Sequence, residues 1–480
     1  MIRLTHYLTK NTALIPLIAL CLSNRISTTP ANNYQDPVVF HTVMGSDKFY
    51  NPGGKANLSL HLSPFYAHTH TAYTPQGKKA SNGNVFGTWN MAGLFLNDNP
   101  RPTTQPMSFY TKTKNVLKNL KNQSSTLPYS KDYTNEATFN PDEDAYQAVY
   151  YQAVDLKYEK MGLRGQLNFD LGVGLGAAVK GGIANLKSRL PTYTIQKNFG
   201  TAAGLLPVDP EAGTSPAPGA QPQALQIYES SLGENARRQL FKELNFDASE
   251  SNITDLEDLY GNVYWHVPIK IKEKGDHVFS LIPYLSVGAS LPMGKDRNQN
   301  RLYPVINGND GYTGLTAEGA IALDFPNMMQ LSFGGGITMF NTRDLTNAHV
   351  PTSEFQRGIY PWTTSISRQP GAIWYANVSM KADNIASKRD IPNFSCYFDY
   401  IYTEHQHDTI KLKEPKATFA QYFRPDLLER DSSWKAQILH GGIKFGLSKN
   451  VYMATAVQTI IGGTRVYRPT TLLGSLIMTF

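Results

Sequence analysis

Residues that could bind a metal ion lie together in one short stretch of the sequence. Glu404-His405-Gln406-His407-Asp408 places two imidazoles one residue apart, with a carboxylate on either side. Neutral imidazoles and carboxylates are usual ligands of Zn²⁺, and imidazole also suits Cu²⁺. The alternative interpretation is an exposed polar loop. We predict no metal site, and the residues that would form one are His405, His407 and Asp408.

Motifs of enzymatic catalysis are missing from the sequence. It contains no Gly-x-Ser-x-Gly turn, no His-Glu-x-x-His, no Cys-x-x-Cys and no phosphate-binding glycine loop. His61, His266 and His440 lie in alternating segments, but a sequence does not show whether a triad converges on any of them. We expect no enzymatic activity, no catalytic residues and no cofactor.

A larger group of charged residues falls on one side of segments that alternate between apolar and polar side chains. Alternation sends successive side chains to opposite faces of a strand. In residues 165–179 and 278–291, the apolar face carries no charge. We expect the opposite faces to line the interior of a barrel. The predicted pore-lining residues are Asp155, Asp170, Lys180, Lys270, Lys272, Glu318, Asp324, Lys381, Asp383, Asp399 and Lys444.

The last residues of the sequence form another alternating segment. Leu472, Gly474, Leu476, Met478 and Phe480 share one face, and the residues between them are partly polar. This segment resembles the closing strand of bacterial outer-membrane β-barrels, in which a terminal Phe recurs. The resemblance implies a transmembrane barrel whose assembly machinery recognises Phe480, Met478 and Leu476. An ordinary edge strand is the alternative.

The first residues have the layout of a secretory signal peptide. Arg3 and Lys10 precede a short apolar run, and small residues follow it. The run is shorter than the roughly 20 apolar residues of a membrane-spanning helix. We predict a signal peptide at residues 1–23, with cleavage at 31 or acylation of Cys21 as alternatives. Cleavage would leave Cys396 as a single thiol, which excludes a disulfide-stabilised fold.

Composition and segment lengths agree with an exported barrel. The chain has 27 Tyr, 22 Phe and 38 Gly but is only 17% charged, which suits aromatic girdles and a lipid-facing surface. Beyond the signal peptide we predict a periplasmic segment at 24–36 and a barrel at 37–480. The fold class is all-β: a transmembrane antiparallel up-and-down barrel of about 14 strands, with 12 to 16 open. The expected strands are 37–44, 56–66, 84–96, 146–158, 165–179, 260–272, 278–291, 312–325, 328–342, 372–383, 393–403, 435–448, 451–461 and 469–480.

Long and short connections alternate between these segments, as they do in outer-membrane barrels. The expected outer loops, with short helices in some of them, are 97–145, 185–259, 292–311, 343–371 and 404–434. One connection, residues 68–83, is long where a turn is expected. Loops of this length are uncommon unless they have a function.

Three functions remain open for such a barrel. A cylinder of 14 strands is about 27 Å across, so a lumen with charges of both signs would let small solutes diffuse with little ion selectivity. Phe49-Tyr50-Asn51-Pro52-Gly53-Gly54 resembles the Asn-Pro-Ala segment of FadL-type transporters, which implies 14 strands, a lumenal hatch and hydrophobic cargo. A surface or adhesion barrel that displays its loops is the third. Expected partners are outer-membrane lipid, lipopolysaccharide and the barrel-assembly machinery, with homo-oligomers left open and no nucleic acid.

Overall fold

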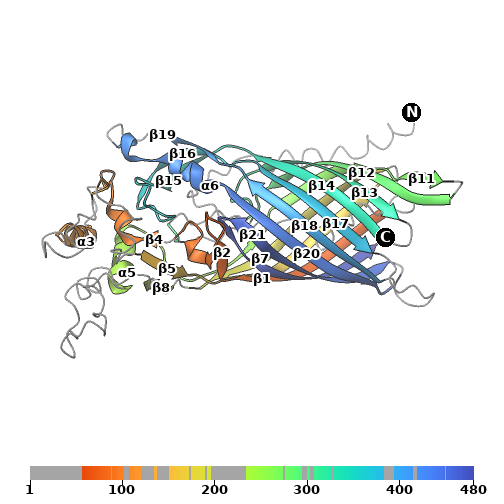
Figure 1. Cartoon of the computed structure of the whole chain (residues 1–480), viewed down its shortest axis with the longest axis horizontal. Helices are drawn as coiled ribbons and strands as arrows, with labels where there is room; N and C mark the ends of the chain where they lie inside the picture. The colour runs from red at the N-terminus through yellow and green to blue at the C-terminus, as the bar shows by residue number, and fades with distance from the viewer. Residues whose placement is uncertain are drawn as a thin grey trace, which may run out of the picture.

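The chain folds into a closed antiparallel β-barrel with a folded cap at one end (Figure 1). This computed structural model describes residues 57–87, 89–101, 107–119, 135–137, 151–171, 174–189, 192–195, 234–273, 276–294, 300–302, 308–325, 329–382, 394–413, 419–448 and 450–480. The predicted signal peptide, the periplasmic segment, the strand at 37–44 and the FadL-like segment lie outside these residues.

Twelve strands close the barrel, and two more extend the same sheet to 14. The ring is up-and-down, because each strand pairs with its neighbours along the chain and β23 returns to β1. Closure leaves no unpaired edge. This confirms the predicted all-β barrel of about 14 strands. The ring consists of β1 (Asn57–Thr69), β6 (Tyr158–Asp170), β7 (Leu175–Ser188), β10 (Leu259–His266), β12 (Asp276–Leu291), β13 (Gly314–Phe325), β14 (Met329–Phe340), β17 (Ile373–Ala382), β18 (Phe394–His405), β20 (Trp434–Gly446), β21 (Val451–Thr464) and β23 (Thr470–Thr479).

The two additional strands extend pairings of the ring. β9 (Ser251–Leu256) pairs with the end of β7, where Ser188 lies opposite Ser251. β11 (Ile269–Glu273) continues the line of β10 along β12, where Ile269 lies opposite Leu281. The predicted strand at 260–272 is therefore one line of pairing, interrupted at residues 267–268.

Apart from residues 465–469 between β21 and β23, the short connections between ring strands lie at one end of the barrel and the long ones at the other. We call these the turn end and the loop end. The connections at the turn end include residues 171–174, 326–328 and 447–450. The connections at the loop end include residues 70–157, 189–258, 292–313, 341–372 and 406–433.

One predicted strand, residues 165–179, is in fact a hairpin. β6 ends at Asp170, β7 begins at Leu175, and the Leu171 N–H donates to the Leu175 carbonyl at 2.8 Å. Gly174 has φ of +82°, a conformation that favours glycine. The apolar residues before and after the turn all have odd numbers, so the alternating pattern of the sequence continues across the turn. The gap between the predicted strands 146–158 and 165–179 consequently lies within β6.

Two other predicted barrel strands belong to the cap. Residues 84–96 form short 3-10 turns and the two-residue β4 (Trp89–Asn90). Of residues 146–158, Tyr151–Asp155 form β5, which pairs with β4 and β8 instead of with the ring. Because neither segment crosses the barrel, all of 70–157 is one loop-end connection. This explains why the connection at 68–83 did not fit the alternation.

The cap is built from the long connections and lies beyond the loop end of the barrel (Figure 1). It contains the short helices that the fold prediction placed in the loops. Its elements are β2 (Thr71–Tyr73), β3 (Lys79–Ser81), η2 (Asn82–Asn84), β4, η3 (Met91–Phe95), α3 (Ser108–Asn119), β5, β8 (Thr192–Ile195), α5 (Glu234–Glu243), β15 (Arg343–Val350), β16 (Trp362–Gln369), β19 (Thr409–Lys413), η7 (Ala420–Tyr422), α6 (Pro425–Ser432) and β22 (Val466–Tyr467).

Candidate functional site

The interior of the barrel is the candidate site, because it gathers polar and charged side chains from the whole ring. Side chains paired across neighbouring strands point to the same face. The interior face identified in this way includes Asp170, Lys180, Glu318, Asp324, Lys381, Asp399 and Lys444.

The other predicted pore-lining residues differ in position. Lys270 on β11 lies opposite Ser280, on the interior stripe of β12 near the turn end, and is exposed. Asp155 is on β5 in the cap, not in the barrel wall. The side chain of Lys272 and the whole of Asp383 lie outside the described residues.

Interior tyrosines lie against glycines of the neighbouring strand. Tyr264, Tyr375 and Tyr397 stand directly opposite Gly176, Gly336 and Gly442. A Cβ at Gly442 would lie 2.6 Å from the Tyr397 hydroxyl, and one at Gly336 would lie 2.7 Å from the Tyr375 ring. A Cβ at Gly176 would overlap the Tyr264 ring. The rings therefore occupy space along the wall that only glycine leaves free.

Two hydrogen-bonded groups cross the interior wall. His440 Nδ1 lies 3.0 Å from Asp399 Oδ2, and His440 Nε2 lies 3.4 Å from the Tyr397 hydroxyl. The Tyr375 hydroxyl donates to Glu318 at 2.8 Å, and Ser286 donates to the other Glu318 oxygen at 3.1 Å. An imidazole between a carboxylate and a hydroxyl is an arrangement used in acid–base catalysis. Here His440 and Asp399 are only 1% and 2% exposed, so no substrate reaches them in this state.

Interior side chains differ in exposure along the barrel. Partly exposed interior residues include Asp170, Lys180, Glu318, Asp324, Tyr375, Asn377 and Lys444, which extend from the turn end to the middle. At the loop end Lys160, His405 and Trp434 are buried, and the Trp434 and His405 rings stack 5.7 Å apart. Behind them Ile401, Ile438 and Ile460 form an apolar cluster. Large side chains therefore occupy part of the interior next to the cap.

The cap has a hydrophobic core of its own, to which each of the long connections contributes. Buried contributors are Leu94, Leu240, Leu302, Trp362 and Leu428, one from each connection. Burying a side chain of this size stabilises by about 1.5–3 kcal/mol. The connections therefore form one folded unit over the loop end instead of separate projecting loops.

A buried arginine joins three of these connections. Arg368 on β16 is 1% exposed, and its Nε donates to Asp408 Oδ2 at 2.6 Å. Its Nη1 lies 3.9 Å from Asp310 Oδ2, and its guanidinium lies over the Tyr312 ring at 5.6 Å. Burial alone would lower the pKa of Arg368, but Asp408, Tyr312 and Asp310 together raise it above its ordinary value. We call Arg368, Asp408 and Asp310 the latch.

A second ion group lies inside the barrel below the cap. The Glu257 carboxylate is 2.7 Å from both Lys160 Nζ and Arg164 Nε, and the Arg164 guanidinium lies over the Phe65 ring. Lys160 and Glu257 are buried, and breaking such a pair costs about 3–5 kcal/mol. This group fixes β6 against the segment that follows β9.

The histidines considered as metal ligands are engaged elsewhere. His405 Nδ1 lies 3.1 Å from the Ser432 carbonyl, and His407 Nδ1 lies 2.9 Å from the Glu429 carbonyl. Asp408 belongs to the latch. Within the described residues, no group of three or more metal-ligating side chains is positioned around a common point.

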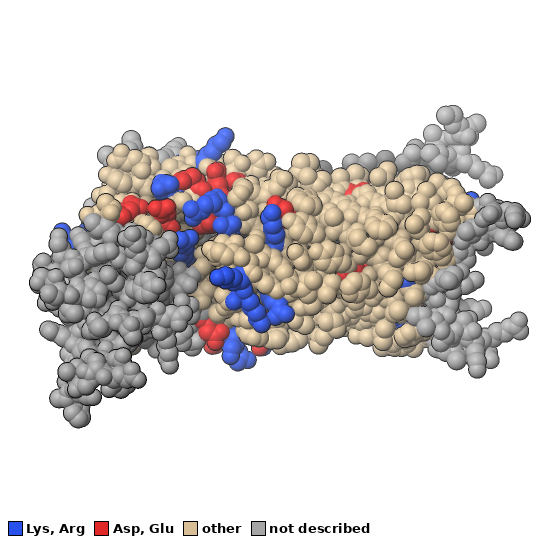
Figure 2. Space-filling model, viewed as in Figure 1, with Lys and Arg blue, Asp and Glu red and all other residues tan. Residues whose placement is uncertain are grey.

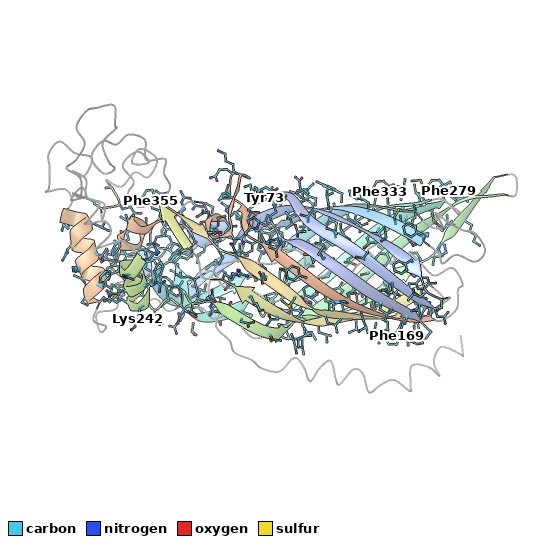
Figure 3. All side chains as sticks on the ribbon, turned by 90° about the horizontal axis from the view of Figure 1, so that it is seen from below. Tyr73, Phe169, Lys242, Phe279, Phe333 and Phe355 are labelled. Atoms are coloured by element: carbon cyan, nitrogen blue, oxygen red, sulfur yellow. The ribbon has the colours of Figure 1, made fainter. Side chains whose placement is uncertain are left out.

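The outside of the barrel is an apolar belt between two aromatic zones. Leu285, Val287 and Leu315 are each more than half exposed, which is unusual for a surface facing water. Near the loop end, Trp374 and Tyr402 pack at 5.2 Å, and toward the turn end Phe279 and Phe325 pack at 5.9 Å. Figure 3 places Phe169 and Phe279 toward the turn end, and Tyr73 in the part of the cap next to the barrel. On the face shown in Figure 2, charged side chains gather where barrel and cap meet, and few lie on the barrel wall.

These features decide the fold. It is a closed β-barrel with an apolar outer wall, as expected of a barrel that spans a membrane. The apolar belt includes the predicted assembly residues, since Leu476 and Met478 lie on the same exterior face of β23 as Leu472, and Phe480 is 69% exposed. None of the described helices is long and apolar enough to cross a membrane.

Comparisons with known proteins find only distant likenesses. No protein-family model and no curated protein matches the sequence. Among solved structures, an outer-membrane channel from Pseudomonas putida F1 has a TM-score of 0.45 at 9% identity, covering 92% of this chain and 100% of the other. The β domain of the Bordetella autotransporter BrkA has a TM-score of 0.32 at 10% identity, covering 68% and 95%. A Pseudomonas aeruginosa FadL homologue has 0.23 at 11%, covering 95% and 98%. Likenesses this distant carry no argument about what this chain does.

The stability of the cap is expected to depend on pH through His349. Its ring is buried and stacked on Phe246, and Nδ1 lies 2.7 Å from the Tyr360 carbonyl. Burial lowers its pKa to about 4 against the opposing effect of the Tyr360 carbonyl. Between about pH 6.5 and pH 4, His349 therefore takes up a proton in the unfolded cap but stays neutral in the folded cap. The contribution of His349 is complete above pH 6.5 and is lost as the pH falls toward 4.

Hydrogen exchange of the β15 and β16 amides at pH 7.5 and 4.5 measures this effect. Between pH 7.5 and 4.5, we expect the free energy of cap opening to fall by about 2–3 kcal/mol more in the native protein than in the variant His349→Phe. The Phe side chain cannot take up a proton. Equal losses in the two proteins would show that His349 does not control the pH response.

Proposed function

We propose that this chain is a channel of an outer membrane, whose lumen passes small solutes and whose cap controls access at the loop end. The observation that carries the proposal is the interior surface of β12, β13 and β14. A 12-stranded cylinder is about 23 Å across, and eight strands already accommodate their own side chains. Small residues make up most of this surface, beside the larger Ile282 and Tyr284, so its side chains fill less of the additional width than large ones would. The small residues are Ser280, Ser286, Gly288, Ser290, Gly314, Thr316, Ala320, Ala322, Ser332, Gly334 and Gly336.

The belt supports the proposed location in an outer membrane. Exposed apolar side chains on β7, β12, β13 and β14 would be costly in water, and the closed ring satisfies its backbone without solvent. We place the cap on the outer side, where barrels of this kind carry their long loops. Transport, not catalysis, is the activity we assign.

Transport of hydrophobic compounds is a second candidate with its own support. Phe65, Leu473 and Ile477 form an apolar cluster with Ala454 and Ala456 inside the barrel, on β1, β21 and β23. Such a stripe suits an apolar solute better than an ion. A barrel that merely displays loops is less favoured, because the loops pack into one cap.

Swelling of liposomes that contain the folded protein tests the proposal. We expect entry of small neutral sugars, with rates that fall as the sugar grows. Charges of both signs in the lumen predict similar rates for cationic and anionic amino acids. Swelling no faster than in protein-free liposomes, with the barrel shown to be folded, would contradict a channel for polar solutes.

A further inference from the structure

The outside of the barrel changes from apolar to charged along one line across three neighbouring strands. Tyr66, Met161 and Asn185 form a row on β1, β6 and β7, and Tyr66 and Met161 are exposed on the apolar belt. One step toward the cap, the row is His68, Glu159 and Lys187.

The next row adds two more cations. The Arg189 N–H donates to the Lys157 carbonyl at 3.0 Å, which places these two residues side by side just past the ends of β6 and β7, beyond Glu159 and Lys187. We call Lys157, Lys187 and Arg189 the basic patch. Its positions lie on or next to the exterior stripes that carry Met161 and Ile183, so it faces the surroundings of the barrel and not the lumen.

The basic patch has more positive charge than the protein neutralises. Arg189 lies 3.4 Å from Glu159, and the Arg189 side chain is 64% exposed, so this pair is held loosely. Within the described part of the chain, Lys157 and Lys187 have no carboxylate within ion-pair distance. Beside Lys187, the Asn185 amide donates to Asn252 and Thr254, both at 2.8 Å, which adds polar groups suited to a sugar or phosphate.

The position of the basic patch along the barrel axis indicates which class of ligand it would bind. It stands immediately beyond the belt, at the level of lipid headgroups, on the cap side of the barrel. Cations there meet anionic headgroups before they meet bulk solvent. We propose that the basic patch binds the phosphates of a phosphorylated glycolipid, such as lipopolysaccharide, in the outer leaflet. The proposal requires the membrane location given above but not an open lumen.

Binding of diphosphorylated lipid A to the detergent-folded protein tests this proposal. The test variant is the triple substitution Lys157→Gln, Lys187→Gln and Arg189→Gln. We expect the affinity of this variant for lipid A to fall by about tenfold or more, because it lacks three positive charges at the level of the lipid headgroups. Affinity for chemically dephosphorylated lipid A should be low for native and variant protein alike.

A charge-matched control removes three exposed cations of the cap by Lys411→Gln, Lys413→Gln and Arg424→Gln. This control should bind lipid A as the native protein does. Retained affinity in the test variant, or equal affinity for both forms of lipid A, would overturn the proposal. Displacement of lipid A by millimolar inorganic phosphate would also overturn it, since the site would then take a free anion. Heat-dependent gel mobility confirms that each variant is folded.

Discussion

The variant Arg368→Met is expected to loosen the cap and to increase the time that the channel spends open. Methionine fills similar space but leaves Asp408 without its 2.6 Å partner, and Asp408 and Asp310 are 3% and 5% exposed. Leaving a buried charge without its counter-ion costs about 3–5 kcal/mol. Because Arg368 joins three connections, that loss should appear as faster hydrogen exchange across β16 and β19.

The matched control is Lys413→Met, which breaks the Lys413–Asp344 pair on the same small sheet. Both of its side chains are about half exposed, so we expect a change of about 0–1 kcal/mol. Adding Asp408→Asn and Asp310→Asn to Arg368→Met should recover part of the lost stability, because the two carboxylates left without a counter-ion are then neutral. Equal exchange in Arg368→Met and Lys413→Met would show that the latch does not hold the cap.

The variant Gly176→Val is expected to destabilise the barrel and to narrow its lumen. A side chain at this position would overlap the Tyr264 ring, which lies directly opposite. The ring must then leave the wall and project into the interior. Overpacking of this kind costs about 1–3 kcal/mol, measurable by urea unfolding of the folded barrel. Solute entry should slow in the same variant.

Gly165→Val provides the control for this prediction. Gly165 lies on the exterior face of β6, and a Cβ there meets nothing within 4 Å. Valine should be tolerated there because β-branched residues suit strands. The double variant Gly176→Val, Tyr264→Ala should regain solute entry. If Gly176→Val slows entry and the double variant does not regain it, the Tyr264 ring is not the obstruction.

Alternation along the chain predicted most of the barrel because lipid imposes it on every strand. The faces assigned to Leu285, Phe480 and Glu318 follow directly from which side of the wall is apolar. The same rule failed at residues 165–179, where an even spacing between Leu171 and Leu175 carried the pattern through a turn. Gly172 and Gly174 were the available signal, since glycines two residues apart suit a tight turn.

The cap could not be predicted in the same way. Its core brings Leu94, Leu302 and Trp362 together across hundreds of residues, and no period in the sequence relates them. The latch has the same origin, because Arg368 meets Asp310 and Asp408 only after three connections fold over the loop end. The interior glycines gave a partial signal, but their tyrosine partners depend on the register between strands.

Single-channel recording in a planar bilayer, with native protein and Arg368→Met side by side, tests the central claim most directly. We expect discrete current steps from both proteins, with brief openings in the native protein and longer openings in the variant. A silent bilayer with both proteins, each shown to be a folded barrel, would contradict a lumen that conducts when the cap opens.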